Sequence, residues 1–92
     1  SSAASDVYKR QAKNRYSGFF NTLLESKLAA ETPDKVIICG VCTDICVLYT
    51  ASDARNRDYH VDVPEDCVAS FNSDAHDWAL SHLKHILGAN VI

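Results

Sequence analysis

The stretch KVIICGVCTDICVLYTASDA, Lys35–Ala54, decides the fold. Its apolar start is typical of a buried parallel strand, and its end, Leu48–Ala54, is typical of a helix. Cys46 therefore lies just past a strand-to-helix turn, where unpaired backbone N–H groups and the helix dipole favour an anion. Because the thiolate is the reactive form of cysteine, we expect Cys46 to be a nucleophile beside amides that bind an oxyanion. A buried cysteine that only fills space is the alternative interpretation.

The flanking segments continue an alternation of helix and strand. The predicted order is a helix from the N-cap Ser17 to Thr32–Asp34, a strand at Val36–Cys39, a helix at Asp44–Asn56, a strand at Tyr59–Val63, a loop at Pro64–Asn72, a helix at Ser73–Leu87 and a strand at Ala89–Ile92. This order predicts an α/β fold with a doubly wound parallel sheet flanked by helices. Three helices and three strands are few for such a sheet, so we expect a C-terminal fragment of the domain. Trp78 lies on the apolar stripe of the last helix, and we expect it in the core.

The composition fits one small domain, with 92 residues, 47% of them apolar, and a net charge of −3. We expect a foreign-looking or disordered tail at residues 1–11, which show no regular pattern, and the domain half at residues 12–92. The charge disfavours nucleic acid as a partner, and no apolar stretch reaches the roughly 20 residues that span a bilayer. Three of the four cysteines lie close together, around the end of one predicted strand and the start of the next helix. This layout is not that of a small secreted domain held together by disulfides. We therefore expect reduced thiols and a cytoplasmic location.

Three further groups of residues each have two interpretations. A metal cluster is suggested by Cys39, Cys42, Cys46, His82 and His85. Its spacing matches no zinc finger or ribbon, so we disfavour it. Lys13 is either a solvated lysine or a partner that stabilises a thiolate. Asp44 is either an acid that complements the helix dipole or a group with a chemical role, and the structural interpretation is favoured.

Several segments resemble one family of enzymes, namely Lys13–Phe19 (KNRYSGF), Gly40–Val47 (GVCTDICV), Thr50–Ala54 (TASDA) and Val68–Asn72 (VASFN). They occur in the order found in isochorismatase-like cysteine hydrolases, and within that family they are most similar to bacterial nicotinamidases. The resemblance covers Ala12–Ile92, which is about half of a domain of typical size. The cysteine at position 46 argues against the family members that lack a catalytic cysteine.

The resemblance implies a role for several residues. Cys46 matches the family nucleophile, and Lys13 matches the lysine of the catalytic triad. Val41–Cys42 matches a cis peptide that aims the N–H groups of Cys42 and Cys46 at one oxygen, and Tyr16 matches a residue beside the substrate ring. The family's catalytic aspartate and metal ligands lie upstream of the matched segments. The resemblance therefore implies a divalent metal, zinc, with no ligand in this chain.

These roles predict a hydrolase that acts on a linear carboxamide C–N bond. Nicotinamide and water would give nicotinate and ammonia through a thioester on Cys46, in NAD salvage. The expected partner is this small-molecule amide, without nucleic acid or membrane, and a homo-oligomer of the full-length protein stays open. Because the catalytic aspartate is absent, we expect residues 1–92 alone to be inactive. Two alternatives remain: another amidase or carbamoyl hydrolase of the same fold, and a non-catalytic binding domain.

Overall fold

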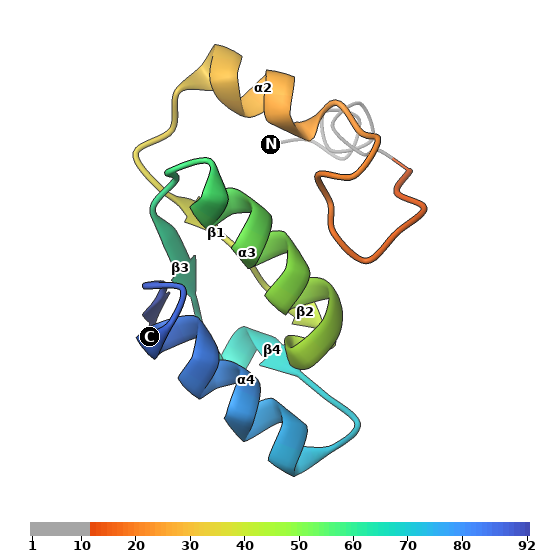
Figure 1. The fold of residues 1–92 in the computed structure, drawn as a ribbon, viewed down its shortest axis with the longest axis vertical. Helices are drawn as coiled ribbons and strands as arrows, with labels where there is room; N and C mark the ends of the chain where they lie inside the picture. Colours follow the sequence, from red (N-terminus) through yellow and green to blue (C-terminus); the bar gives the residue numbers. More distant parts are fainter. Residues whose placement is uncertain (1–11) are drawn as a thin grey trace.

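Short helices and short parallel strands make up residues 12–92, the part of the chain that the computed structural model describes (Figure 1). The tail predicted at residues 1–11 lies outside the described residues. The elements are α2 (Leu24–Glu31), β1 (Val36–Ile37), β2 (Gly40–Val41), a π-helical turn (Thr43–Val47), α3 (Leu48–Asn56), β3 (Val61–Val63), a 3-10 turn (Glu65–Cys67), β4 (Val68–Ala69), α4 (Ser73–His85) and β5 (Asn90–Val91). No helix among residues 12–92 is long and apolar enough to cross a membrane.

The strands form two small parallel sheets. The first has the order β1-β3-β5, with Val36 opposite Val61. The second consists of β2 and β4, with Gly40 opposite Val68. The two longest helices, α3 and α4, contact each other, and they also contact β3 and β5 respectively. The predicted α/β class with parallel strands and flanking helices is therefore confirmed.

The core lies where α3, β3 and α4 meet. Ala51 and Ala54 of α3 have no exposed surface, and their small side chains let the helix approach the strands closely. Val63 of β3 and Leu83 of α4 are also fully buried. Since truncating a buried leucine commonly costs about 2–5 kcal/mol, Leu83 is a principal contributor to stability.

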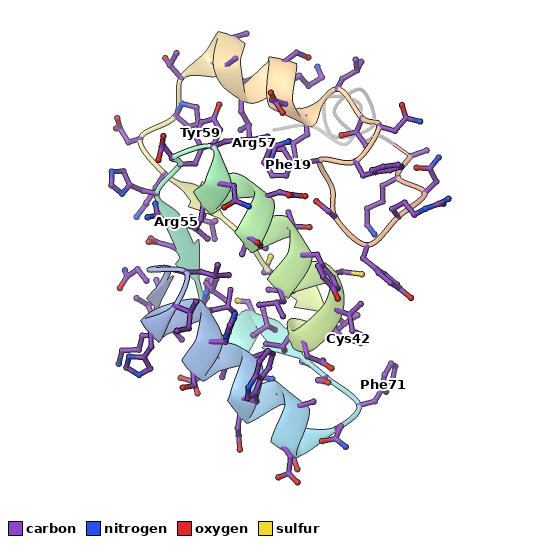
Figure 2. All side chains as sticks on the ribbon, viewed as in Figure 1. Phe19, Cys42, Arg55, Arg57, Tyr59 and Phe71 are labelled. Carbon is purple, nitrogen blue, oxygen red and sulfur yellow. The ribbon has the colours of Figure 1, made fainter. Side chains whose placement is uncertain are left out.

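One arginine joins the end of α3 to two later segments of the chain. The Arg55 side chain donates from Nε to the Leu87 carbonyl at 2.7 Å and from Nη1 to the Tyr59 carbonyl at 2.9 Å (Figure 2). Gly88, which follows, has a φ of 69°, the left-handed conformation that a residue ending a helix commonly adopts. Arg55 thus fixes the turn that leads from α4 into β5.

The first predicted helix begins later than expected. α2 starts at Leu24, so the assignment of Ser17 as its N-cap is wrong. The Ser17 hydroxyl instead donates to Asp53 and accepts from the Phe19 N–H. These contacts hold the segment in turns. Phe19 of the same segment packs into the core, where it is 6% exposed. The helix ends before Thr32, as predicted.

The strand predicted at Val36–Cys39 covers only Val36–Ile37, and a separate strand follows at Gly40–Val41. Gly40 has a φ of 121°, a conformation that residues with a side chain rarely adopt, and the chain passes from one sheet to the other there. β1 therefore ends at Ile37, and β2 pairs with β4, which lies inside the predicted loop Pro64–Asn72. Ile37 is 59% exposed, so this strand is less buried than its apolar sequence predicts.

α4 starts as predicted, but its buried face is narrower than its apolar stripe. The side-chain oxygen of Asn72 caps the helix. Ala79 and Leu83 are fully buried, whereas Trp78 is 56% exposed and stacks on His82 with ring centroids 4.8 Å apart. The prediction that Trp78 lies in the core is therefore wrong. Adjacent helix positions differ by about 100° in direction, so the face that buries Ala79 leaves Trp78 at its edge.

Candidate active site

The turn that carries Cys46 joins β2 to α3. The peptide bond between Val41 and Cys42 is cis, as the resemblance implies. The Cys42 carbonyl then accepts hydrogen bonds from the N–H groups of Ile45 at 3.0 Å and Val47 at 3.1 Å, within a π-helical turn. The predicted position of Cys46, just past a strand-to-helix turn, is confirmed, although the turn is wider than an ordinary first turn of an α-helix.

Lys13 reaches this turn across a sequence separation of 33 residues. Its Nζ lies 3.8 Å from the Cys46 Sγ and donates to the backbone carbonyls of Arg15 at 3.0 Å and Tyr16 at 3.3 Å. The two carbonyls hold the ammonium group at the sulfur by taking two of its donors. A positive charge beside a cysteine stabilises the thiolate form. The structure thus brings two of the predicted site residues into a contact that can do chemistry.

An open hollow faces this contact. Its lining residues are Lys13, Asn14, Arg15, Tyr16 and Cys46. Its volume of about 570 Å³ lies within the range of roughly 300–1,000 Å³ that is usual for small-molecule sites. Cys46 is partly exposed, so a ligand in the hollow has access to the sulfur.

One aromatic ring, that of Tyr16, lines the hollow. Tyr16 stacks on Tyr49 of α3, with ring centroids 5.9 Å apart and an angle of 16° between the planes. Both rings, together with Phe20, line a second hollow, which shares Arg15 and Tyr16 with the first. Aromatic side chains provide large apolar faces for a flat ring. Tyr16, which the resemblance associates with the substrate ring, therefore lies at the candidate site.

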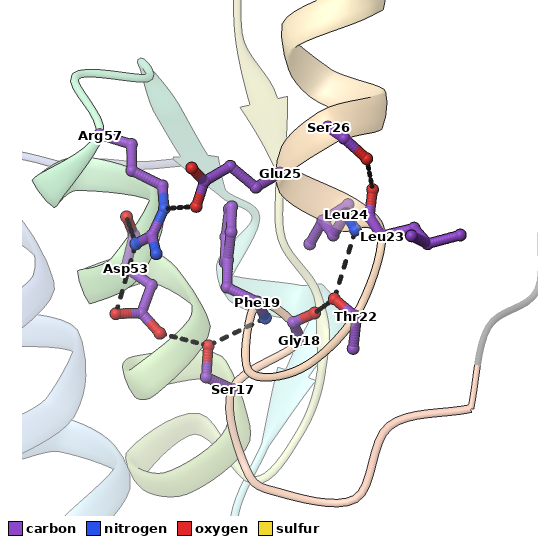
Figure 3. A network of polar contacts seen from close by, with 10 residues as sticks. All are labelled: Ser17, Gly18, Phe19, Thr22, Leu23, Leu24, Glu25, Ser26, Asp53 and Arg57. Carbon is purple, nitrogen blue, oxygen red and sulfur yellow. Dashed lines mark hydrogen bonds and ion pairs between the residues drawn. The ribbon is translucent and has the colours of Figure 1, made fainter.

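The segment that carries Lys13 is docked on α3 by polar contacts (Figure 3). The Ser17 hydroxyl donates to the Asp53 carboxylate at 2.5 Å, and the Gly18 N–H donates to the Thr50 Oγ1 at 3.0 Å. Asp53 and Thr50 lie one turn apart on the same helix. The position of Lys13 is therefore set by α3, the helix that follows the Cys46 turn.

A second set of contacts joins α2 to the end of α3. The Arg57 Nε donates to the Glu25 carboxylate at 2.5 Å, and the guanidinium lies 4.8 Å from the centroid of the Phe19 ring (Figure 3). The hydrogen bond from Arg57 to Glu25 raises the pKa of the guanidinium, and nearby Asp53 adds to the effect. The side chains are 34% exposed for Arg57 and 60% exposed for Glu25, so we assign this contact to docking geometry rather than to a large stability gain.

The other side of the Cys46 turn is held by the segment that follows β4. The Thr43 Oγ1 lies 2.8 Å from the His76 Nδ1, and Thr43 is fully buried. The Ser70 hydroxyl donates to the Asp44 carboxylate at 2.6 Å. Sequence reasoning did not identify these supports, although Ser70 belongs to Val68–Asn72, one of the segments that carry the resemblance.

The described residues do not form a metal site. Among residues 12–92, no group of three or more His, Cys, Asp and Glu side chains could hold a metal ion. The cysteines and histidines that suggest a metal cluster in the sequence are therefore not brought together. All four cysteines are free. A divalent metal does not fit the residues present, and we assign no chemical step to one.

Comparison with known proteins identifies the class of protein. The sequence signature described as "Isochorismatase domain" matches residues 4–92. The chain therefore belongs to the isochorismatase family. It is 49% identical over 79 residues to a Bacillus subtilis (strain 168) protein named "Uncharacterized isochorismatase family protein PncA", a match that covers 86% of this chain and 43% of that protein.

Solved structures show a similar fold. The structure is similar to the crystal structure of the nicotinamidase SaPncA from Staphylococcus aureus, with a TM-score of 0.84 and 53% identity over 86% of this chain and 49% of that one. It is also similar to a pyrazinamidase of Pyrococcus horikoshii in complex with zinc, with a TM-score of 0.81 and 32% identity over 90% of this chain and 46% of that one. The chain spans less than half the length of each of these relatives.

Proposed function

We propose that this chain carries the nucleophile of a cysteine amidohydrolase that converts nicotinamide and water to nicotinate and ammonia, in NAD salvage. The observation that carries the proposal is the 3.8 Å contact between the Lys13 Nζ and the Cys46 Sγ at an open hollow. A partly exposed cysteine beside an ammonium group has the surroundings of a reactive thiol. The similarity to the S. aureus nicotinamidase supports nicotinamide as the substrate.

In the proposed reaction the Cys46 thiolate attacks the carboxamide carbon, and the carbonyl oxygen becomes an oxyanion. Lys13 stabilises the thiolate before the attack. The N–H groups of Cys42 and Cys46 donate to the oxyanion, and loss of one such donor commonly costs about 2.7–4 kcal/mol of transition-state stabilisation. The C–N bond then breaks, and the nitrogen leaves as ammonia after it takes a proton. Water hydrolyses the resulting thioester to nicotinate and the free thiol.

We propose that the residue that accepts the thiol proton lies outside residues 12–92. Asp44, which is near Cys46 in sequence, accepts the Ser70 hydrogen bond and supports the turn. The resemblance implies an upstream aspartate for the proton transfer, so residues 1–92 alone should show no turnover. The four free thiols agree with the cytoplasmic location that we propose.

Tyr16 is the proposed contact for the aromatic part of the substrate. Its ring is 61% exposed at the border of the hollow, and its stacking on Tyr49 fixes its orientation. A pyridine ring packed against it would bring a carboxamide substituent toward Cys46. The substrate class that follows is a small planar aromatic amide.

A chimaeric enzyme tests the proposal. Residues 12–92 replace the matched segment of the S. aureus nicotinamidase, and ammonia release from nicotinamide is measured. We expect turnover in the chimaera and its loss to background after Cys46→Ala, because no other side chain is proposed to form the thioester. Cys67→Ala is the matched control, since this exposed cysteine lies outside the turn and should leave turnover unchanged.

Two results would contradict the assignment. One is a Cys46→Ala chimaera that retains turnover, which would remove Cys46 from the chemistry. The other is a chimaera that is folded by circular dichroism and binds nicotinamide but releases no ammonia. Turnover of a carbamoyl or ureido compound in place of nicotinamide would retain the cysteine chemistry and replace the substrate.

A further inference from the structure

Two cysteines directly precede the paired strands β2 and β4. Gly40 is opposite Val68, and Val41 is opposite Ala69. Cys39 and Cys67 are the residues that directly precede these pairs. Cys67 ends the 3-10 turn Glu65–Cys67, and Cys39 directly precedes β2. Because the two strands run in the same direction, we expect these two residues to be neighbours as well.

The separation between these two positions suits a disulfide. Paired strands lie about 4.7–4.9 Å apart, and a disulfide joins Cα atoms that are about 4.4–6.8 Å apart. Both thiols are free, and both residues are exposed, so an oxidant has access to them. Neither residue belongs to the candidate active site.

The surroundings of the Cys67 thiol raise its pKa. Desolvation raises the pKa of the Cys67 thiol, and the Asp66 carboxylate, 3.6 Å from the sulfur, raises it further. A thiolate on Cys39 raises the pKa of Cys67 as well, by less than desolvation and Asp66 do.

We propose that Cys39 and Cys67 form a thiol pair that a hydroperoxide oxidises to an intramolecular disulfide. The Cys39 sulfur attacks hydrogen peroxide, the O–O bond breaks, and a sulfenic acid and water form. The Cys67 sulfur then attacks the sulfenic sulfur, an S–S bond forms, and a second water leaves with the remaining protons. Two thiols are oxidised and one peroxide is reduced to two waters. Cys67 takes the second step because its thiolate is disfavoured at neutral pH.

The disulfide would clamp the two strands that hold the Cys46 turn. β2 leads directly into the Val41–Cys42 bond and the turn, and β4 leads into Ser70, which holds Asp44. Joining the strands at their start limits how far they can separate. The pair is therefore a redox-sensitive clamp at the base of the candidate site, and it does not depend on the proposed substrate.

Peptide mapping of the oxidised 92-residue chain tests the proposal. The reduced chain is treated at high dilution with one equivalent of hydrogen peroxide, capped with iodoacetamide and digested with trypsin without reduction. Trypsin separates peptide 36–55, which holds Cys39, Cys42 and Cys46, from peptide 58–84, which holds Cys67. A Cys39–Cys67 bond joins the two peptides, whereas a Cys42–Cys46 bond leaves peptide 36–55 alone and lighter by two hydrogens.

We expect the joined peptides as the main product, lost in Cys39→Ser and Cys67→Ser and retained in Cys42→Ser and Cys46→Ser. The same reaction in 6 M guanidinium, which is the denatured reference, should lose this selectivity. The proposal is overturned if Cys39→Ser still gives the joined peptides, or if the native and denatured chains give the same distribution of bonds. Sulfinic acid without any joined peptide would also overturn it.

Discussion

Replacing Ser17 with Ala removes the hydroxyl that joins the Lys13 segment to α3. That hydroxyl donates to the Asp53 carboxylate at 2.5 Å and accepts from the Phe19 N–H at 3.1 Å. A hydrogen bond to a charged group contributes about 1.5–3 kcal/mol and a neutral one about 0.5–1.5 kcal/mol. The low end of each range applies because Asp53 is partly exposed. Ser17→Ala should therefore weaken docking by about 2 kcal/mol, which is about a 30-fold change in the undocking equilibrium.

Amide hydrogen exchange at Gly18 measures this change. The Gly18 N–H donates to the Thr50 Oγ1 at 3.0 Å, so its protection reports docking on α3. We expect its protection factor to fall about 30-fold in Ser17→Ala. Ser26→Ala is the matched control, because the Ser26 hydroxyl contacts only an exposed carbonyl of its own helix at 2.9 Å, and it should change protection by less than about threefold. Equal protection of Gly18 in the two variants would refute the reasoning.

Two further predictions concern the stability of the described residues. Thr43→Val removes the 2.8 Å contact with His76 from a fully buried position, so the free energy of unfolding in urea should fall by about 1–3 kcal/mol, and a change below about 0.5 kcal/mol would contradict the assigned support. The Lys35 ammonium, 3.0 Å from the Asp62 carboxylate, lowers the pKa of that carboxyl below its ordinary value. The stability from this pair is complete above about pH 4 and is lost as the pH falls through the lowered pKa, so Asp62→Asn should flatten the urea stability profile below about pH 4.

The features that local sequence determines were predictable. An apolar run followed by Gly40 and a helix-forming segment placed Cys46 at a strand-to-helix turn, and the structure confirms that position. Pro33 marked the end of the first helix in the same way. In both cases the backbone preference of a few neighbouring residues is sufficient, and no distant partner is needed. The cis peptide before Cys42 came only from the family resemblance, since nothing in spacing or composition predicts it.

The features that depend on distant partners were not predictable in this way. Ser17 has the composition of an N-cap, but Asp53 competes for its hydroxyl from a helix that lies 36 residues along the chain. Trp78 has the size of a core residue, but the buried face of α4 carries Ala79 and Leu83 instead. β4 is too short for any pattern to predict, and it exists because β2 offers a parallel partner. Each of these errors reflects a tertiary contact that overrides a local preference.

The candidate site has one common frame, the helix α3. Thr50 and Asp53 of this helix receive the Lys13 segment, and Cys46 lies about one turn before Thr50. The ammonium group and the sulfur are therefore both attached to α3, the first through the docked segment and the second through the turn that leads into the helix. Cys46 has separate supports on the β4 side of its turn, so loosening the Ser17 contact displaces Lys13 and leaves the sulfur in position. The two halves of the candidate site are consequently separable: the position of the Lys13 ammonium group depends on docking, and the position of the Cys46 thiol does not.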